Sequence, residues 1–357
     1  MNLKKKLLNK NKLCYTVVVA FYLVMQLLSM TVGLTRAVEG WLVPICVYVV
    51  AAIALNLVVG ISGELSLGHA GFMSIGAFSG AIFFHLFRGI GNDIVQLILC
   101  MLMGGLIAGL FGLIIGIPVL RLRGDYLAIV TLAFGEIIKN VLNCVYLSYD
   151  ADRWYVSFGE KTFTAGSGAV DVLSGPQGLT GNAKVATFTV GICLILFTLF
   201  IVLNLIRSRH GRAIMAIRDN RIAAESIGLS AFKYKMIAFT TSAALTGMAG
   251  ALFAMNYAAL KPSKFDFNTS ILILVYVVLG GMGNILGSIL ATVVLYVLPE
   301  LPFMRGLGNY RMLIYAVLLI GVMLMTQSSG GKRLQEQIKG FFAKLFKKKG
   351  KGGESDE

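Results

Sequence analysis

Residues 41–59 read Trp41-Leu-Val-Pro-Ile-Cys-Val-Tyr-Val-Val-Ala-Ala-Ile-Ala-Leu-Asn-Leu-Val-Val59, without a single charged side chain. A helix of about 20 apolar residues crosses a hydrocarbon layer about 30 Å thick. Because similar runs recur along the chain, we predict an all-α fold, a polytopic transmembrane helical bundle of about ten spans. The predicted spans are Cys14–Leu34, Trp41–Val59, His69–Phe87, Ile94–Pro118, Tyr126–Leu147, Ala186–Ile206, Met236–Ala258, Ser270–Leu279, Ile285–Leu298 and Arg311–Thr326. The eighth of these is short enough to be a half-helix.

The composition excludes a soluble protein. The mean hydropathy is +0.80, 57% of the residues are hydrophobic, and only 14% are charged. Soluble domains carry about 25% charged residues, and a soluble core with fewer would leave large apolar patches exposed and aggregate. The apolar surface is therefore expected to face lipid.

The net charge of +15 fits membrane topology better than nucleic acid binding. With the N-terminus inside, the alternate loops and the two termini hold 22 of the 32 Lys and Arg residues. Such residues collect on the cytoplasmic side of spanning helices, where anionic lipids attract them. We predict a multi-pass protein of the bacterial inner membrane with both termini cytoplasmic. The predicted parts are a basic N-terminus (1–13), a permease domain (14–326) with a cytoplasmic loop (207–235) and an external loop (148–184), and a basic tail (327–357).

The N-terminal run is expected to be a retained helix, and the C-terminal tail to lie on the inner membrane surface. A basic N-terminus before an apolar run resembles a signal peptide, but the apolar core of a signal peptide is about 7–15 residues long and ends at a small-x-small site. The run from Cys14 to Leu34 is longer and has no such site, which predicts a retained first helix. The segment Lys332–Lys351 mixes Lys with Leu, Ile and Phe, a pattern typical of amphipathic segments that bind membrane lipid.

No catalytic or metal-binding grouping is present in the sequence. The five cysteines lie in or beside apolar runs without a CxxC pattern, so we expect small buried hydrophobes and no metal. The histidines are scattered, and no Walker A or GxSxG pattern occurs. The chain is predicted not to be an enzyme, so energy for active transport would come from another subunit or from an ion gradient.

Small residues recur at helical spacing in two predicted spans. The first set is Gly105, Gly109, Gly112 and Gly116, and the second is Ala243, Gly247, Gly250 and Ala254. This spacing places small residues on one helix face, where a neighbouring helix can approach closely. Helix packing is the preferred interpretation, and a narrow substrate path is the alternative.

Two glycine-rich segments interrupt the apolar pattern. Gly60-Ile-Ser-Gly-Glu-Leu-Ser-Leu-Gly-His-Ala-Gly-Phe72 is polar enough for a broken helix beside a translocation path, or for a tight cytoplasmic turn. Gly280-Gly-Met-Gly-Asn-Ile-Leu-Gly287 echoes it in the second half, although so short a match can also arise by chance. The candidate path residues in these segments are Glu64, Ser66, His69, Gly280 and Gly283.

Glu136 and Lys139 lie within the fifth predicted span. Charged groups in lipid are costly, so both should face protein or water, and residues three apart can pair on one helix face. Glu136 is therefore a candidate path or gating residue, and a plain structural ion pair is the alternative.

The basic loop 207–235 contains a helix-compatible run from Gly211 to Gly228. A short amphipathic helix between spans can lie on lipid or dock into a groove of a partner. The spacing A-A-x-x-x-G of Ala223, Ala224 and Gly228 resembles the EAA loop of ABC importer permeases, with Ile222 in place of the usual leading Glu. The candidate residues for coupling to an ATPase are Arg218, Arg221, Ala223, Ala224, Glu225 and Gly228.

Together these segments resemble the branched-chain amino acid ABC permease family, in particular its LivM-like subunit. The motifs occur in family order over about residues 50–325. They are Gly63-Glu-Leu-Ser-Leu-Gly-His-Ala-Gly-Phe72, Arg121-Leu-Arg-Gly-Asp-Tyr-Leu-Ala-Ile-Val-Thr-Leu-Ala-Phe-Gly-Glu136, Gly175-Pro-Gln-Gly-Leu-Thr-Gly181, Gly211-Arg-Ala-Ile-Met-Ala-Ile-Arg218, Ala223-Ala-Glu-Ser-Ile-Gly228 and Val277-Val-Leu-Gly-Gly-Met-Gly-Asn284. Met325–Gly331 stands where the family usually has an Arg-Pro-x-Gly-like segment, which puts the end of the last helix in doubt.

The resemblance implies a division of labour. A solute-binding protein outside the membrane would deliver Leu, Ile or Val, a LivH-like permease subunit would pair with this chain, and two cytoplasmic ATPases would bind ATP and Mg. No cofactor is expected in this chain. Permeases for urea, short amides or other small polar solutes are similar in sequence, so the solute stays open. A self-sufficient secondary transporter using Glu136 or Glu64 as a proton site is the alternative from another class.

Overall fold

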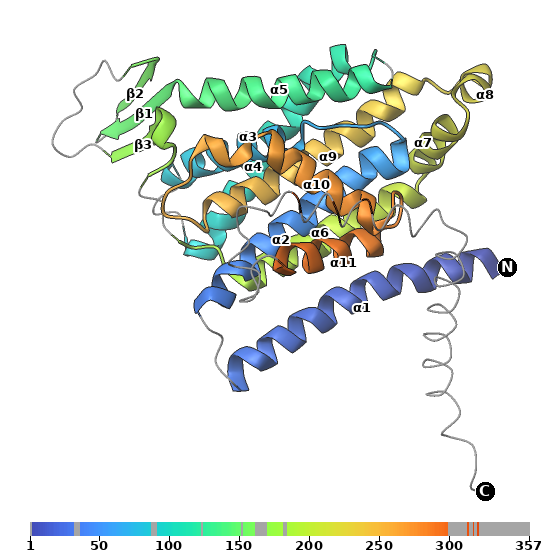
Figure 1. Ribbon diagram of the computed structural model, residues 1–357, viewed down its shortest axis with the longest axis horizontal. Helices are drawn as coiled ribbons and strands as arrows, with labels where there is room; N and C mark the ends of the chain where they lie inside the picture. The colour runs from blue at the N-terminus through green and yellow to red at the C-terminus, as the bar shows by residue number, and fades with distance from the viewer. Residues whose placement is uncertain are drawn as a thin grey trace, which may run out of the picture. The chain divides into compact units, whose positions relative to one another are not determined.

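The computed structural model describes residues 2–31, 36–86, 91–122, 124–150, 153–160, 170–180 and 184–298, together with Leu313, Val317 and Ile320. The chain divides into two units, Met1–Val297 and Leu298–Glu357, and the first contains nearly all described residues. Its helices are α1 (Asn2–Thr31), α2 (Arg36–Asn56), α3 (His69–Leu86), α4 (Asp93–Val119), α5 (Asp125–Asn143), α6 (Phe188–Arg207), α7 (Arg209–Asp219), α8 (Arg221–Ser226), α9 (Ala231–Ala254), α10 (Phe267–Gly280) and α11 (Ile285–Val297). Short π- and 3₁₀-helical turns lie at Leu57–Ser62, Gly175–Gln177 and Pro262–Phe265 (Figure 1).

Within the described residues, six helical segments are long and apolar enough to cross a membrane: Lys12–Thr31, Val38–Ser62, His69–Leu86, Asp93–Val119, Phe188–Arg207 and Ala231–Ala254. The predicted spans that correspond to α5, α10 and α11 are not among these six. The last two are apolar but contain only 14 and 13 residues, which corresponds to about 20 Å of helix each. The tenth predicted span, Arg311–Thr326, lies almost entirely outside the described residues. The ten-span count is therefore met only in part.

The all-α prediction misses a small antiparallel sheet of order β2-β1-β3. Its strands are β1 (Val145–Asp150), β2 (Arg153–Phe158) and β3 (Val170–Ser174), and Val145 pairs with Phe158. The fifth span was predicted to continue to Leu147, but α5 ends at Asn143. Leu147 of β1 is buried against the core, and the Val and Tyr residues of this strand favour an extended conformation over a helix.

Helix α9 packs against α2, α3 and α4, and these four helices form the centre of the unit. Backbones approach closely where glycines meet: a Cβ added to Gly76 would lie 2.0 Å from the carbonyl oxygen of Gly247. The glycines of α4 face α9, because Cβ atoms on Gly105 and Gly116 would meet Met248 and Met236. Gly250 of α9 faces α3, where an added Cβ would meet the Met73 carbonyl oxygen. Gly109 and Gly112 approach Ala244 and Ala243 in the same way. The two predicted sets of small residues thus lie at helix–helix contacts.

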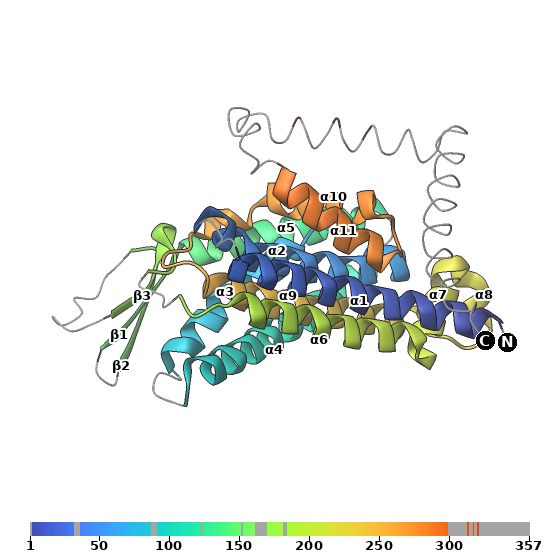
Figure 2. The ribbon, with the colours of Figure 1, turned by 90° about the horizontal axis from the view of Figure 1, so that it is seen from below.

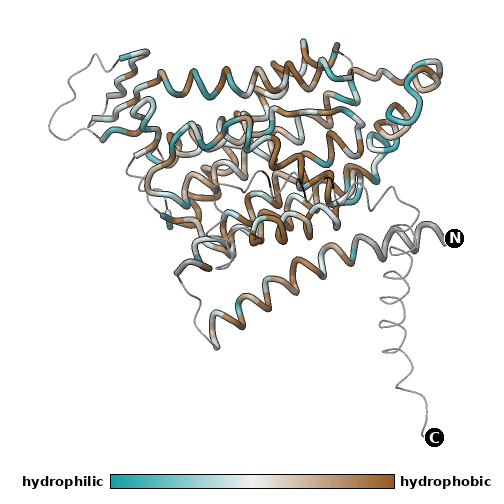
Figure 3. The backbone as a smooth tube through the Cα atoms, viewed as in Figure 1, coloured by the Kyte–Doolittle hydropathy of each residue, from teal (hydrophilic) through white to brown (hydrophobic). Residues whose placement is uncertain are grey.

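The opposite face of α4 consists of large apolar side chains that remain exposed. Leu102, Leu106, Leu110, Leu113 and Ile114 are between 46% and 63% exposed. Apolar colour covers the long helices, whereas polar colour concentrates at α7, at α8 and in the sheet, at opposite ends of the unit (Figure 3). A helix with a small-residue face against protein and a large apolar face outward is typical of a lipid-embedded bundle.

Helices α10 and α11 form a short hairpin that packs against α2, on the side away from α4 (Figure 2). The turn between them needs glycine, because Gly281 and Gly283 have φ of +91° and +79°. A Cβ on Gly287 would collide with the carbonyl oxygen of Gly280. These glycines allow the hairpin to close tightly and bring its turn to the end of α2.

Candidate functional site

The basic loop 207–235 folds into two helices joined by a sharp corner. Ser208 caps α7 by accepting a hydrogen bond from the Gly211 N–H at 3.1 Å, and the Asn220 side chain caps α8 by accepting from Ala223 at 3.0 Å. These short polar side chains satisfy the free N–H groups of a helix start, which explains why the chain bends at Asn220. The single helix predicted from Gly211 to Gly228 is therefore wrong in this detail.

The tip of this loop, Arg221–Gly228, carries an exposed apolar surface. Ile222 and Ile227 are 82% and 75% exposed, and Ala223 and Gly228 beside them are also exposed. The pair Arg221–Glu225, at 2.8 Å, borders this surface. Large apolar side chains held outward on an ordered helix are typical of a protein docking site.

Ala224 does not belong to that surface. Its side chain is only 4% exposed and packs with Ile217 and Ala231, inside the corner between the two helices and α9. Of the six candidate coupling residues, Ala224 is therefore placed inside the loop, where a larger side chain would disturb the fold of the corner.

Arg218 also points inward, toward the end of α2. Its Nη1 donates to the Gly60 carbonyl oxygen at 2.9 Å, while Nε and Nη2 donate to Asp219. A Cβ on Gly63 would lie 2.6 Å from Arg218 Cγ, and Gly63 has φ of +77°. Glycine is thus required at this position both by backbone conformation and by the arginine stem. This side chain ties the loop to the first glycine-rich segment.

A second charged contact joins the same segment to α9. Glu64 forms an ion pair with Lys235, and both side chains are 12% exposed. Helix α2 continues as a π-helical turn to Ser62, so the irregular connection is limited to Gly63–Gly68. The connection touches α7 and α9, as expected for a turn at the end of a span, and it is shorter than the sequence suggested.

The two glycine-rich segments meet at Asn56. This side chain accepts a hydrogen bond from the Gly283 N–H at 2.8 Å and donates to Ser288 Oγ at 2.9 Å, and it is fully buried. A Cβ on Gly60 would lie 2.2 Å from the Gly283 nitrogen. The predicted echo of the first segment in the second therefore corresponds to a direct contact, which we call the glycine junction (Gly60–Gly68 with Gly280–Gly287).

His69 begins α3 beside the glycine junction and is 1% exposed. Its Nε2 lies 2.7 Å from Ser242 Oγ, which donates to the Ala54 carbonyl oxygen at 2.6 Å. Because that hydroxyl proton is used, Nε2–H is the donor to Ser242 and Nδ1 accepts, with Ser66 Oγ at 3.4 Å. The network links α2, α3 and α9 through uncharged groups.

Glu136 is brought to the start of α10. It forms an ion pair with Lys139, and its Oε1 accepts from the Phe267 N–H at 3.0 Å. A carboxylate at a helix N-terminus satisfies a free N–H and interacts favourably with the helix dipole. Glu136 lies on α5, away from the Arg218 contact, so the structure does not join all the predicted path residues into one cluster.

Several polar residues of this region were not predicted as site residues. They are Asn56, Lys235, Ser242 and Ser288, and also Thr131, whose Oγ1 accepts from the Leu67 N–H at 3.0 Å. Asn56 interrupts the otherwise apolar run 41–59, and that signal could have identified it. Lys235 could not be found in this way, because its partner Glu64 is 171 residues away.

Cysteines and metal ligands add nothing further to the site. Cys14, Cys46 and Cys100 are buried as predicted, whereas Cys144 and Cys193 are exposed, contrary to the prediction, because they lie on outward faces of their segments. Among the described residues, His, Cys, Asp and Glu form no group of three or more that could hold a metal ion.

Long apolar helices, small-residue contacts and a basic loop tied to a buried junction define a multi-pass membrane protein of the permease class. The model of the family described as "Branched-chain amino acid transport system / permease component" matches residues 37–324. The chain belongs to this family.

Three relatives show the extent of the similarity. The "High-affinity branched-chain amino acid transport system permease protein LivM" is 37% identical in Salmonella typhimurium and 39% identical in Escherichia coli, over 288 residues each. Each match covers 78% of this chain and 66% of the relative, so the similarity spans just under two thirds of the relatives' own length. The permease protein BraD of Pseudomonas aeruginosa is 28% identical over 254 residues, which covers 70% of this chain and 79% of BraD. No solved structure matches.

Proposed function

We propose that the chain is one permease subunit of an ABC importer for the branched-chain amino acids Leu, Ile and Val. It would pair with a LivH-like permease subunit and receive its solute from a binding protein outside the membrane. Two cytoplasmic ATPases would bind ATP and Mg and drive the transport cycle, while this chain hydrolyses nothing. The family and the named relatives support the solute class.

The topology that goes with this proposal has ten spans and both termini in the cytoplasm of a bacterial inner membrane. The basic residues of α7, α8 and the N-terminal part of α1 would lie inside, and the sheet β1–β3 outside. In support, α7 and α8 lie at the opposite end of the helices from the sheet (Figure 1). Insertion of a reporter tag after Gly159, which directly follows β2, and after Gly228, in the loop, tests the two sides directly.

One observation carries the coupling part of the proposal: the loop that presents the exposed Ile222 and Ile227 also holds the Gly60 carbonyl through Arg218. A partner that moves the tip of the loop would therefore act on the glycine junction through α7 and its Arg218 side chain. Allosteric coupling requires such a physical connection between a docking surface and the element that changes.

The test is a double substitution, Ile222→Asp with Ile227→Asp, in the transporter assembled with its partner subunits. We expect co-purification of the ATPases to fall by at least about tenfold, because two carboxylates would be desolvated in an apolar contact. Leucine uptake into proteoliposomes should fall in parallel. The matched control is Val156→Asp on β2, where the native side chain is 55% exposed at the other end of the unit.

Retention of the ATPases by the double variant would contradict the docking assignment. Uptake that persists without any ATPase would overturn the importer proposal itself and favour a secondary transporter. Ligand binding measured on the companion binding protein would then decide between Leu, Ile or Val and a different small solute.

A further inference from the structure

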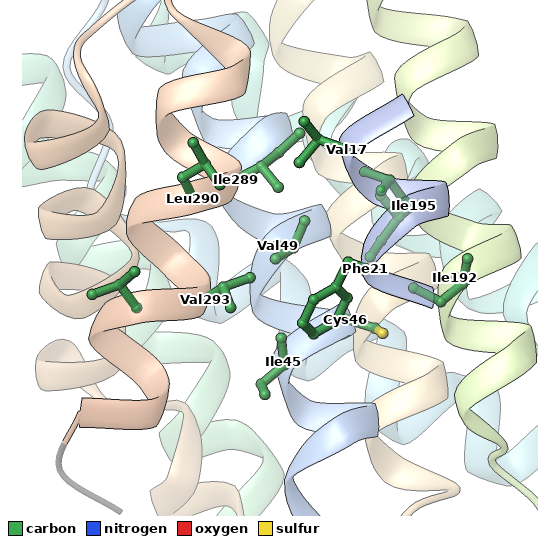
Figure 4. Close-up of a pocket in the computed structure, with 12 residues that line it drawn as sticks. Val17, Phe21, Ile45, Cys46, Val49, Ile192, Ile195, Ile289, Leu290 and Val293 are labelled. Carbon is green, nitrogen blue, oxygen red and sulfur yellow. The ribbon is translucent and has the colours of Figure 1, made fainter. Parts of the chain in front are cut away.

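A cavity lies between α1 and the rest of the helical unit. Four helices line it: Val17 and Phe21 come from α1, Cys46 and Val49 from α2, Ile192 from α6 and Val293 from α11, among others (Figure 4). The space between these side chains, which is partly open to the surroundings, has a volume of about 490 Å³. All of its lining residues are Val, Ile, Leu, Phe or Cys, so nothing in the wall would bind a polar solute or an ion.

Helix α1 is held to the unit at two levels and leaves the cavity between them. Toward one end, Phe21 meets Phe188 edge-on with ring centroids 6.3 Å apart, and the Tyr22 ring also contacts Phe188. Toward the other end, Cys14 and Val18 are each 4% exposed. The remainder of the helix is largely uncovered, since only 11% of its apolar window is buried. The packing of α1 against the other helices therefore depends on what fills the cavity.

Among the described side chains of α1 and α6, the charged ones at the end remote from Phe188 are cations. Lys12 is on α1 and Arg207 is the last residue of α6, and the described side chains of both are exposed. A negatively charged group at this end would meet the positive charges of Lys12 and Arg207, each worth about 1 kcal/mol next to a membrane surface.

The distances along the helices match a lipid. Phe21 follows Lys12 by nine residues, which corresponds to about 13 Å of helix, and Ile195 precedes Arg207 by twelve, about 18 Å. The cavity is thus about as deep below the cations as the middle of an acyl chain lies below its phosphate, in a hydrocarbon core about 30 Å thick.

We propose that this cavity binds an acyl chain of an anionic phospholipid, with the phosphate held at Lys12 and Arg207. With the orientation proposed above, the lipid belongs to the inner leaflet. The chain of the lipid completes the packing of α1 against α2, α6 and α11. The family match begins at residue 37, so α1 lies outside the matched part of the chain, whereas the walls that α2, α6 and α11 contribute lie within it.

The first experiment measures retained lipid on the full-length chain, purified in detergent, by native mass spectrometry. Phosphatidylglycerol and phosphatidylcholine with identical acyl chains are compared. We expect phosphatidylglycerol to bind more tightly, and the double variant Lys12→Gln with Arg207→Gln to weaken its binding by about fivefold per charge removed. The matched control, Lys261→Gln, replaces an exposed lysine away from the cavity and should bind as the wild type does.

The second experiment reports on the cavity from one of its lining positions, Phe21. In a chain with Trp41→Phe and Trp154→Phe, the single tryptophan of Phe21→Trp should be quenched by brominated phosphatidylglycerol at several-fold lower mole fraction than by brominated phosphatidylcholine. The control is Leu106→Trp, at a position where the native leucine is 63% exposed on the outward face of α4. Its tryptophan should be quenched equally by both brominated lipids.

Equal quenching by both lipids in Phe21→Trp would overturn the proposal, as would unchanged phosphatidylglycerol binding in Lys12→Gln with Arg207→Gln. Loss of quenching when a partner permease is added would show that a protein helix occupies the cavity, and this too would overturn it. Both measurements use lipid binding alone, so their outcome is independent of the transport function proposed above.

Discussion

The contact of α3, α4 and α9 and the glycine junction both bring backbones together at glycines, but they are held by different forces. At Gly76 and Gly247 the helices touch with almost no side chain between them, and packing is the main attraction. At the glycine junction, side chains of Asn56 and Arg218 hydrogen-bond to backbone groups of the two segments. The packing contact between the helices can only be kept or lost, whereas the hydrogen bonds of the glycine junction can exchange partners. A conformational change is therefore expected at the junction and not in the helix centre.

The largest effect should come from Gly76→Leu. A side chain there would meet the Gly247 carbonyl oxygen and Cα, at 2.0 and 2.4 Å from the Cβ alone, so the helices must separate. We expect a loss of about 3 kcal/mol of stability and little folded chain in detergent, measured by fluorescence-detected size exclusion. Gly40→Leu is the control, since nothing lies within 4 Å of that position. Normal folding of Gly76→Leu would mean that this contact is not tight.

The next effect is expected from Asn56→Ala, which leaves the Gly283 N–H buried without its acceptor. The cost should be about 2 kcal/mol, seen as a lower midpoint of thermal unfolding. Asn268→Ala provides the comparison, because that side chain is exposed and donates a hydrogen bond to its near neighbour Asp266. A midpoint equal to the wild type would show that the junction is not held by Asn56.

Arg218→Ala should separate function from folding. It removes the bond to the Gly60 carbonyl, so we expect leucine uptake in the assembled transporter to fall about tenfold while membrane insertion is retained. Arg212→Ala, which loses only a bond to the Arg207 carbonyl, is the control. Unchanged uptake in Arg218→Ala would remove the connection between loop and junction.

Glu136→Gln should have the smallest effect on stability, below about 1 kcal/mol. Its ion pair with Lys139 is partly exposed, at 31% and 19%, and glutamine keeps an oxygen that accepts from Phe267. Glu136→Leu loses that acceptor and should be less stable than Glu136→Gln. We also predict that Glu136→Gln impairs uptake more than folding, and wild-type uptake would leave Glu136 with a structural role only.

Local patterns in the sequence were sufficient for the membrane class and for the glycines of α4 and α9. Both depend on side chains within one helix, and helical periodicity alone puts Gly105, Gly109, Gly112 and Gly116 on one face. The sheet was missed because its strands are short and follow a helix directly, so the apolar run through Leu147 resembled the continuation of a span.

The sequence by itself determined a basic, helical, membrane-embedded permease of a recognisable family, because hydropathy and motif order do not depend on contacts between distant residues. Only the tertiary structure decided that Ala224 is buried, that Arg218 points to Gly60, and that Glu64 pairs with Lys235. These partners are between 7 and 171 residues apart in the chain. Their pairing follows from how whole helices pack, and no local periodicity encodes it.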